Sequence, residues 1–361
     1  MSWSFRLIRI LGTEVKIHLT FVLLLAGLWI VTQRGSGAEA ALATTGFILA
    51  LFLCILLHEF GHILMARRFG IRTPDVILLP IGGVARLERM PEDPRQELLI
   101  ALAGPAVTLV IAALLAGWIT LHGQPIMLQP TETEPTNFLL DLMRVNVVLL
   151  VFNLIPAFPL DGGRVLRALL TMRMSHVKAT RIAARIGQGL AMLLGIYGLI
   201  NQNLGMTLIA LFVFFGAGSE VTQVATRAAG KGILVDQMMI TRYTTIPLWA
   251  TLRQAVDLLL EGEQREFPVI DTAGLVAGLL TRDGLIHGLA ARGPESLVRE
   301  AMSANVPLLP LGLDFESALG RLRDSGLPAL PVMDAGGHLV GLLTRDNIAD
   351  LILVRQAVAP R

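Results

Sequence analysis

The chain has 361 residues, of which 53% are hydrophobic and only 16% are charged. Soluble domains usually carry about 25% charged residues, so this composition, with a mean hydropathy of +0.65, indicates a membrane protein with some soluble mass. The formal net charge of +2 argues against a nucleic-acid-binding protein, and the single cysteine excludes an internal disulfide.

Six apolar stretches are long enough to be membrane spans. They cover residues 18–32, 43–66, 97–121, 138–158, 181–200 and 204–222. Basic residues gather before the first span and after the second, fourth and sixth, whereas the opposite loops together hold only Arg34. Because Lys and Arg are retained on the cytoplasmic side, this pattern predicts six crossings of the cell membrane with both termini cytoplasmic.

A histidine pair lies near the cytoplasmic end of the second span. The letters HEFGH place His58 and His62 on one face of a helix, about one turn apart. Both imidazoles can then bind one Zn²⁺, with Glu59 beside the metal as a general base. A polar kink bonded to neighbouring helices is the alternative. Cys54, one turn earlier, is either a fourth ligand or a small buried hydrophobe.

The loop that follows the second span carries a strand signal. VILLPIGGVARLE, residues 76–88, is typical of two short strands around Gly82 and Gly83. The edge of such a hairpin could pair with an extended peptide near the histidines. Alternatively, the hairpin only shields them.

The fourth span ends in NLIPAFPLDGG, residues 153–163, and runs in the same direction as the second span. Asp161 therefore lies at a membrane depth similar to that of the histidine pair. Two histidines and one carboxylate form a catalytic zinc set that leaves a position for water. Pro156 and Pro159 break the helix here, and irregular backbone at membrane depth is tolerated where it lines a cavity. The alternative is an ordinary helix exit with a capping Asp.

The motifs HEFGH, FNLIP (152–156) and LDGG (160–163) together resemble the site-2 protease family of intramembrane zinc metalloproteases. The resemblance covers residues 1–225. It implies that His58, His62 and Asp161 bind one zinc ion and that Glu59 is the catalytic base. It also implies that Asn153 lies near the scissile peptide, although hydrogen bonding between helices is an alternative role. AGP at 103–105 resembles a further family feature.

The C-terminal third contains an internal repeat with a spacing of 63 residues. FPVID at 267–271 recurs as LPVMD at 330–334, and GLLTRD at 278–283 recurs at 341–346. The pattern resembles a tandem pair of CBS domains, at 233–290 and 295–354, with a linker at 226–232 and a tail at 355–361. The expected fold is therefore a polytopic α-helical membrane domain with a small β-hairpin, followed by an α/β pair.

The CBS resemblance implies a cytoplasmic regulatory module that binds an adenine nucleotide and forms a homodimer. Thr281, Asp283, Thr344 and Asp346 are the candidate nucleotide-binding residues. The family's ribose-binding Asp usually lies three residues after the Thr, but those positions hold Gly284 and Asn347. A purely structural role in dimerisation therefore stands as the alternative.

Taken together, the resemblances imply an intramembrane zinc metalloendopeptidase that cleaves membrane-spanning protein substrates in regulated proteolysis. Its active site would face the cytoplasmic side, and the lipid bilayer would be its second partner. Two rival functions remain, namely a transporter or channel gated by CBS domains and a catalytically idle membrane scaffold. A transporter needs a continuous polar path and does not explain Glu59, and the complete HEFGH and LDGG set argues against an idle scaffold.

Overall fold

The structure is a computed structural model that describes residues 3–358, except for residues 81, 87, 89, 90, 92, 124, 125 and 127–136. Most of the loop between the third and fourth predicted spans thus lies outside the described residues. The chain divides into two compact units, Met1–Thr222 and Gln223–Arg361. We call them the helical unit and the repeat unit.

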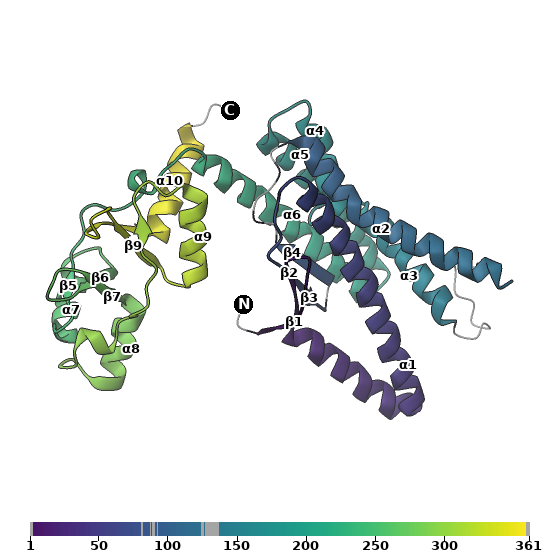
Figure 1. Ribbon diagram of the computed structural model, residues 1–361, viewed down its shortest axis with the longest axis horizontal. Helices are drawn as coiled ribbons and strands as arrows, with labels where there is room; N and C mark the ends of the chain where they lie inside the picture. Colours follow the sequence, from purple (N-terminus) through teal and green to yellow (C-terminus); the bar gives the residue numbers. More distant parts are fainter. Residues whose placement is uncertain are drawn as a thin grey trace. The chain divides into compact units, whose positions relative to one another are not determined.

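The first two predicted spans form one helix, α1 (Leu19–Arg68), instead of two separate ones. The helix is interrupted at Gly37, where φ is 88° and ψ is 175°. Glycine adopts a positive φ at no steric cost, so the chain can turn sharply at this residue. Figure 1 shows the two arms of α1 meeting in a sharp bend.

Five helices complete the helical unit or continue out of it: α2 (Pro94–Leu121), α3 (Phe138–Asn153), α4 (Asp161–Thr171), α5 (His176–Ile200) and α6 (Leu204–Gly230). Among the described residues, α1, α2, α5 and α6 are long and apolar enough to cross a membrane. The fourth predicted span is the shorter α3, which ends at Asn153 instead of 158. The predicted count of six spans therefore does not appear as six long helices. α6 also continues to Gly230, through most of the predicted linker at 226–232.

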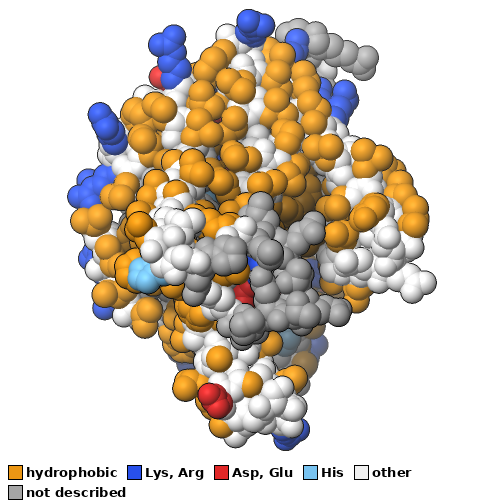
Figure 2. All heavy atoms as spheres, turned by 90° about the vertical axis from the view of Figure 1, so that its right-hand side faces the viewer, with side chains coloured by type: hydrophobic (Ala, Val, Ile, Leu, Met, Phe, Trp, Pro, Cys, Tyr) orange, Lys and Arg blue, Asp and Glu red, His pale blue; other side chains and the backbone are white. Residues whose placement is uncertain are grey.

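Large apolar side chains cover much of the outside of these helices. Leu114 and Leu121 on α2 are 69% and 84% exposed, and Ile200 on α5 is 75% exposed. Figure 2 shows apolar side chains over most of one face, with Lys and Arg mainly around its upper margin. An exposed apolar surface of this extent needs an apolar environment, which agrees with a membrane protein.

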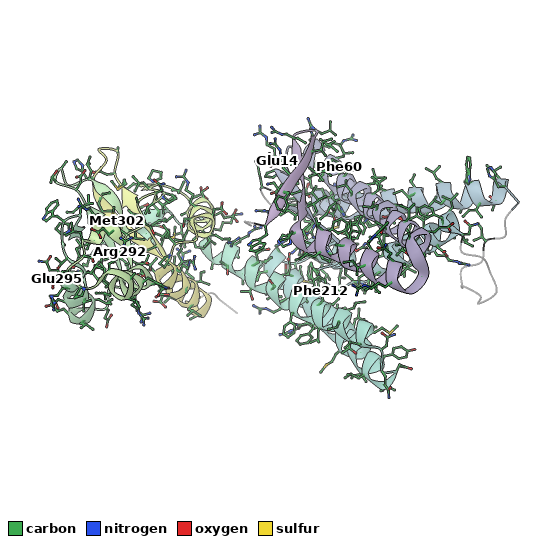
Figure 3. The ribbon with its side chains drawn as sticks, turned by 90° about the horizontal axis from the view of Figure 1, so that it is seen from below. Glu14, Phe60, Phe212, Arg292, Glu295 and Met302 are labelled. Carbon is green, nitrogen blue, oxygen red and sulfur yellow. The ribbon has the colours of Figure 1, made fainter. Side chains whose placement is uncertain are left out.

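A four-stranded sheet packs beside α1. Its order is β1 (Ser4–Ile10), β2 (Thr13–His18), β3 (Asp75–Leu79) and β4 (Gly82–Arg86), with β2 and β3 parallel and the other pairs antiparallel. The predicted hairpin is present as β3 and β4, but its turn precedes Gly82, and both glycines lie in β4. The sequence did not predict β1 and β2. Val15, Val76 and Phe60 form the core between the sheet and α1. Figure 3 labels Phe60 of α1 and Glu14 of β2.

The repeat unit contains two copies of one arrangement, each with its own apolar core. After a 3₁₀ turn (Val235–Gln237), the first copy contains β5 (Ile246–Pro247), α7 (Leu252–Glu261), β6 (Glu266–Ile270), β7 (Val276–Thr281) and α8 (Arg282–Arg292). After a second 3₁₀ turn (Val298–Glu300), the second copy contains β8 (Leu309–Pro310), α9 (Phe315–Ser325), β9 (Ala329–Met333), β10 (Leu339–Thr344) and α10 (Arg345–Val358).

Each copy lends a segment to the sheet of the other. Ile240 forms a bridge with Leu342 of β10, and Ser303 forms the equivalent bridge with Leu279 of β7. Both pairs obey the spacing of 63 residues that the sequence shows. The repeat is therefore structural, and the two copies fold as one body.

Candidate metal centre

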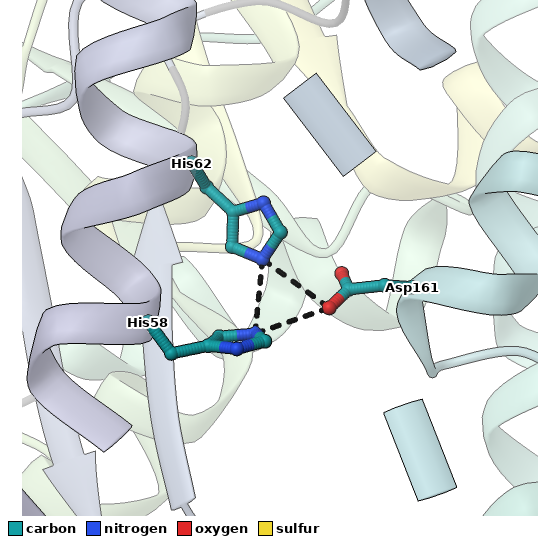
Figure 4. A group of neighbouring side chains, drawn as sticks. All are labelled: His58, His62 and Asp161. Atoms are coloured by element: carbon teal, nitrogen blue, oxygen red, sulfur yellow. Dashed lines mark hydrogen bonds and ion pairs between the residues drawn. The ribbon is translucent and has the colours of Figure 1, made fainter. Parts of the chain in front are cut away.

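Two distant helices bring three side chains to one point. His58 and His62 project from α1, and Asp161 is the first residue of α4. Asp161 Oδ2 lies 3.1 Å from His58 Nε2 and 3.2 Å from His62 Nε2, and the two nitrogens are 3.1 Å apart. Figure 4 shows this triangle. All three residues are buried, and among the described residues they form the group of His, Cys, Asp and Glu that could hold a metal ion.

In each imidazole ring, the hydrogen-bond partner of Nδ1 determines which nitrogen carries the proton and which presents a lone pair to the triangle. His62 Nδ1 lies 2.7 Å from the carbonyl oxygen of Ile100, which can only accept, so Nδ1–H donates. His58 Nδ1 lies 2.8 Å from Thr108 Oγ1, and that hydroxyl in turn reaches the carbonyl of Gly104 at 3.4 Å. In the neutral rings both Nε2 atoms therefore carry lone pairs toward Asp161. Such outer partners orient histidine ligands in metal sites.

This arrangement fits a bound cation. Two imidazole lone pairs and a carboxylate oxygen within 3.2 Å repel one another unless a positive charge lies among them. Ligands at about 2.0–2.1 Å from zinc stand about 3.3 Å apart at tetrahedral angles. The observed separations are close to that value, so the residues present fit zinc.

Gly104 on α2 makes room for this site. A Cβ at this position would lie 2.2 Å from His62 Nε2 and 2.7 Å from His58 Nε2. Any other residue would therefore occupy the space beside the two ligand nitrogens. Gly104 belongs to the AGP stretch at 103–105, which the sequence analysis singled out as a family feature. Its role beside the two histidines was not predicted.

A buried ionic cluster holds the helix that carries Asp161. Arg167 on α4 is only 1% exposed, and its Nε donates to Glu97 Oε1 of α2 at 2.6 Å. Its Nη1 pairs with Glu220 of α6, and its guanidinium lies over the ring of Phe158. The sequence analysis counted Arg167 only among the basic loop residues. Breaking a buried pair of this kind is strongly destabilising, so the cluster anchors α4 between α2 and α6.

A cavity of about 340 Å³ opens onto the three side chains. The predicted residues Glu59, Asn153, Gly82 and Gly83 all line it. A Cβ at Gly83 would lie 2.7 Å from Glu59 Cγ, so β4 passes directly over the predicted base. Phe212 of α6, labelled in Figure 3, contributes to the wall. The structure thus gathers every predicted site residue of the helical unit around one cavity.

Two further polar residues, Cys54 and Asn146, lie in this wall. Cys54 is buried and lines the cavity, and it lies outside the His58, His62 and Asp161 group formed by the described residues, which agrees with its alternative role as a small buried hydrophobe. Asn146 on α3 also lines the cavity and is only 1% exposed. The sequence analysis did not single out Asn146, because one Asn in an apolar helix forms no pattern.

In the repeat unit, the predicted Thr residues serve as helix caps. Thr281 Oγ1 accepts from Gly284 N at 3.0 Å, and Thr344 Oγ1 accepts from Asn347 N at 3.1 Å. The predicted Asp283 and Asp346 follow in the first turns of α8 and α10. In these contacts the two hydroxyls bond to the backbone of the helix that follows. They do not test nucleotide binding by the four residues, which stays a prediction.

The chain matches two family models. The model of peptidase family M50 matches residues 46–132 and 122–194, and the model of the CBS domain matches residues 235–291 and 298–354.

The chain is also similar to two curated proteins and to one solved structure. A zinc metalloprotease of Methanocaldococcus jannaschii is 33% identical, over 96% of this chain and 96% of that protein. Stage IV sporulation protein FB of Bacillus subtilis is 32% identical, over 52% of this chain and 60% of that protein. The solved site-2 protease of M. jannaschii is 36% identical, covering 61% of this chain and 95% of that one, with a TM-score of 0.46.

Proposed function

Because the chain belongs to peptidase family M50 and is a zinc metalloprotease of the site-2 protease type, we propose that it cleaves peptide bonds in or near membrane-spanning segments of other proteins. One observation carries this proposal. Three ligand atoms converge beside Glu59 in a single cavity, inside a unit whose helices expose apolar surfaces. A protease that acted in water would have no need of such a surface.

The mechanism follows from the residues around the cavity. His58, His62 and Asp161 would hold zinc, which when bound would polarise the scissile carbonyl and lower the pKa of a bound water. Glu59 accepts a proton from the attacking water and delivers it to the leaving nitrogen. Asn153 contacts the peptide near the scissile bond. A substrate helix hides its peptide bonds, so it must unwind locally before attack.

The edge of the sheet offers a place for the unwound segment. β4 lies at the end of the order β1-β2-β3-β4, and Gly82 and Gly83 line the cavity. An extended peptide that pairs with this edge would satisfy its own backbone groups and would pass over Glu59.

We also propose a membrane topology of six crossings, in which the two arms of α1 cross separately around Gly37 and the short α3 crosses once. The termini and the metal centre then lie on the cytoplasmic side, as the Lys and Arg distribution supports. Water reaches the centre from that side.

The repeat unit is proposed to be a cytoplasmic regulatory module that forms a homodimer and binds an adenine nucleotide. The match to two CBS domains supports this role. Isothermal titration of the full chain in liposomes with ATP, ADP and AMP tests whether the repeat unit binds a nucleotide. Absence of heat with all three would leave dimerisation as the role of this unit.

The proposed activity is tested by reconstituting the wild type and Glu59→Gln with a reporter that has a single membrane span. We expect cleavage by the wild type only, and no cleavage after zinc is removed by a chelator. Equal cleavage by Glu59→Gln would contradict the role of the base. A zinc-loaded wild type that cleaves no member of a panel of such reporters would contradict the proposed activity and would favour a scaffold.

A further inference from the structure

Asn146 lines the metal cavity, and among the described residues its amide oxygen has no hydrogen-bond partner. Its Nδ2 donates to the carbonyl oxygen of Leu142, at 2.8 Å, one turn earlier on α3. Among the described residues, no donor reaches its Oδ1, although the side chain is almost completely buried. Leaving a buried acceptor unpaired is unfavourable, so this atom calls for an explanation.

The orientation of the amide follows from its neighbour. A backbone carbonyl can only accept, so the group that faces Leu142 must be the NH₂ end. Turning the amide around would place two acceptors against each other. Oδ1 is therefore the end that remains for another partner.

The other acceptor side chains of the cavity wall already have a partner or a role. Thr108 also lines it, but its hydroxyl is already bonded to His58 and to the carbonyl of Gly104. His58, His62, Asp161, Glu59 and Asn153 already have the proposed roles of metal ligands, base and substrate contact. Most of the remaining wall is apolar, including Ile55, Leu149 and Phe212. A membrane helix that unwinds inside this cavity exposes N–H groups that have lost their own carbonyl partners. Each such group needs a new acceptor, because an N–H left unpaired away from bulk water is unfavourable.

We propose that Asn146 Oδ1 accepts a hydrogen bond from a backbone N–H of the unwound substrate, which makes Asn146 a substrate-binding residue. This inference rests on the proposed function. The bond forms only when the substrate is extended, so it favours the cleavable conformation over the helix.

The position of Asn146 on α3 agrees with this role. Asn146 and Asn153 are seven residues apart, so they lie on one face of the helix, about 10.5 Å apart along its axis. Three residues of an extended chain span about 10 Å. Both amides line the same cavity and can therefore contact one extended segment.

The test compares Asn146→Leu with wild type in the reconstituted full chain. Leucine has a similar volume and lacks the orphaned oxygen. Thr45→Val is the matched control, because Thr45 Oγ1 on α1 is also buried without a partner among the described residues but lies outside the cavity wall. We expect unchanged zinc content and an unchanged or raised melting temperature in both variants. For Asn146→Leu, kcat/KM should fall about 10- to 100-fold, as expected for one lost buried hydrogen bond, while Thr45→Val should keep its activity.

A second set of reporters identifies the donor. Each synthetic single-span reporter carries one ester in place of one peptide bond near the cleavage position, which removes a single N–H and keeps the carbonyl. If Asn146 accepts from a substrate N–H, the advantage of wild type over Asn146→Leu should disappear on one of these reporters.

The outcomes separate this inference from the function on which it rests. Normal cleavage by Asn146→Leu would overturn the inference and leave the proposed function intact. Slower cleavage by the same factor on every ester reporter would also overturn it, because a structural defect does not depend on one N–H. Failure of the zinc-loaded wild type on all reporters would overturn the proposed function, and the inference with it.

Discussion

The metal centre and the repeat unit both bring together motifs that are distant in sequence, but their polar atoms are used differently. In the metal centre, Nε2 of His58 and His62 and Oδ2 of Asp161 face one another, and all three are acceptors. In the repeat unit, Thr281 and Thr344 use their hydroxyls to cap the helices that follow. Where the polar atoms of a motif form hydrogen bonds with the nearby backbone, their role in folding is enough to explain the motif. A motif whose acceptors face one another requires a ligand.

The sharpest way to break this comparison is Gly104→Ala. The added methyl carbon would occupy the space beside both ligand nitrogens, so zinc content and cleavage should fall by more than about 100-fold. Zinc can be measured by mass spectrometry of the purified chain. Gly117→Ala on the same helix is the control, because nothing lies within 4 Å of its added carbon. Full zinc occupancy in Gly104→Ala would contradict the assigned ligands.

Thr108→Val should have a smaller effect on the same site. It removes the acceptor of His58 Nδ1–H but leaves all three ligands in place. Loss of such an outer partner typically lowers metal affinity about 10- to 100-fold. Competition with a zinc chelator measures the affinity, and Thr120→Val provides the control, since Thr120 is exposed on the same helix and bonds only to backbone carbonyls. Equal affinities would mean that His58 does not need this partner.

Thr281→Ala tests the other side of the comparison. If Thr281 is a cap, its loss should destabilise the start of α8 by about 1 kcal/mol. Amide hydrogen exchange there should then be about fivefold faster, while the rate of cleavage should not change. Thr281→Ser keeps the hydroxyl and should behave as wild type. Hydrogen exchange of the full chain, followed by mass spectrometry, gives the local rates. A loss of nucleotide binding in Thr281→Ala with unchanged exchange would instead support the ligand role.

Glu266→Gln should have the smallest effect, and it depends on pH. Burial raises the pKa of Glu266 above its usual 4.5, and Asp346 and Asp283 raise it further, against the influence of Arg265. The folded state therefore favours protonated Glu266, and this contribution to stability is lost as the pH rises from about 4.5 through the folded pKa. Glutamine does not titrate, so the variant should melt at a higher temperature than wild type at about pH 7 and at the same temperature at about pH 4. Glu263→Gln, at an exposed position, should show no such difference.

The sequence predicted those features that depend on local pattern. The i, i+4 spacing placed His58 and His62 on one face, and the loop charges placed Asp161 at a similar depth. The repeated letters predicted two equivalent copies, which the paired bridges of Ile240 and Ser303 confirm.

Features that depend on contacts across the fold were missed. Arg6, Arg9 and Lys16 are among the basic residues before the first predicted span, but that they lie on two strands, β1 and β2, was not predicted. Nothing in the local pattern shows that two distant strands pair with the loop after α1. Arg167 and Asn146 are single polar residues, so their meaning depends on what surrounds them in space.

The most direct test of the central claim is X-ray absorption at the zinc edge of purified Glu59→Gln, which keeps every proposed ligand. The account predicts one zinc per chain, surrounded by two imidazole nitrogens and by oxygens at about 2.0–2.2 Å, without sulfur. A sulfur neighbour at about 2.3 Å would make Cys54 a ligand and would contradict the assigned set. Absence of zinc from a folded chain would contradict the metal centre altogether.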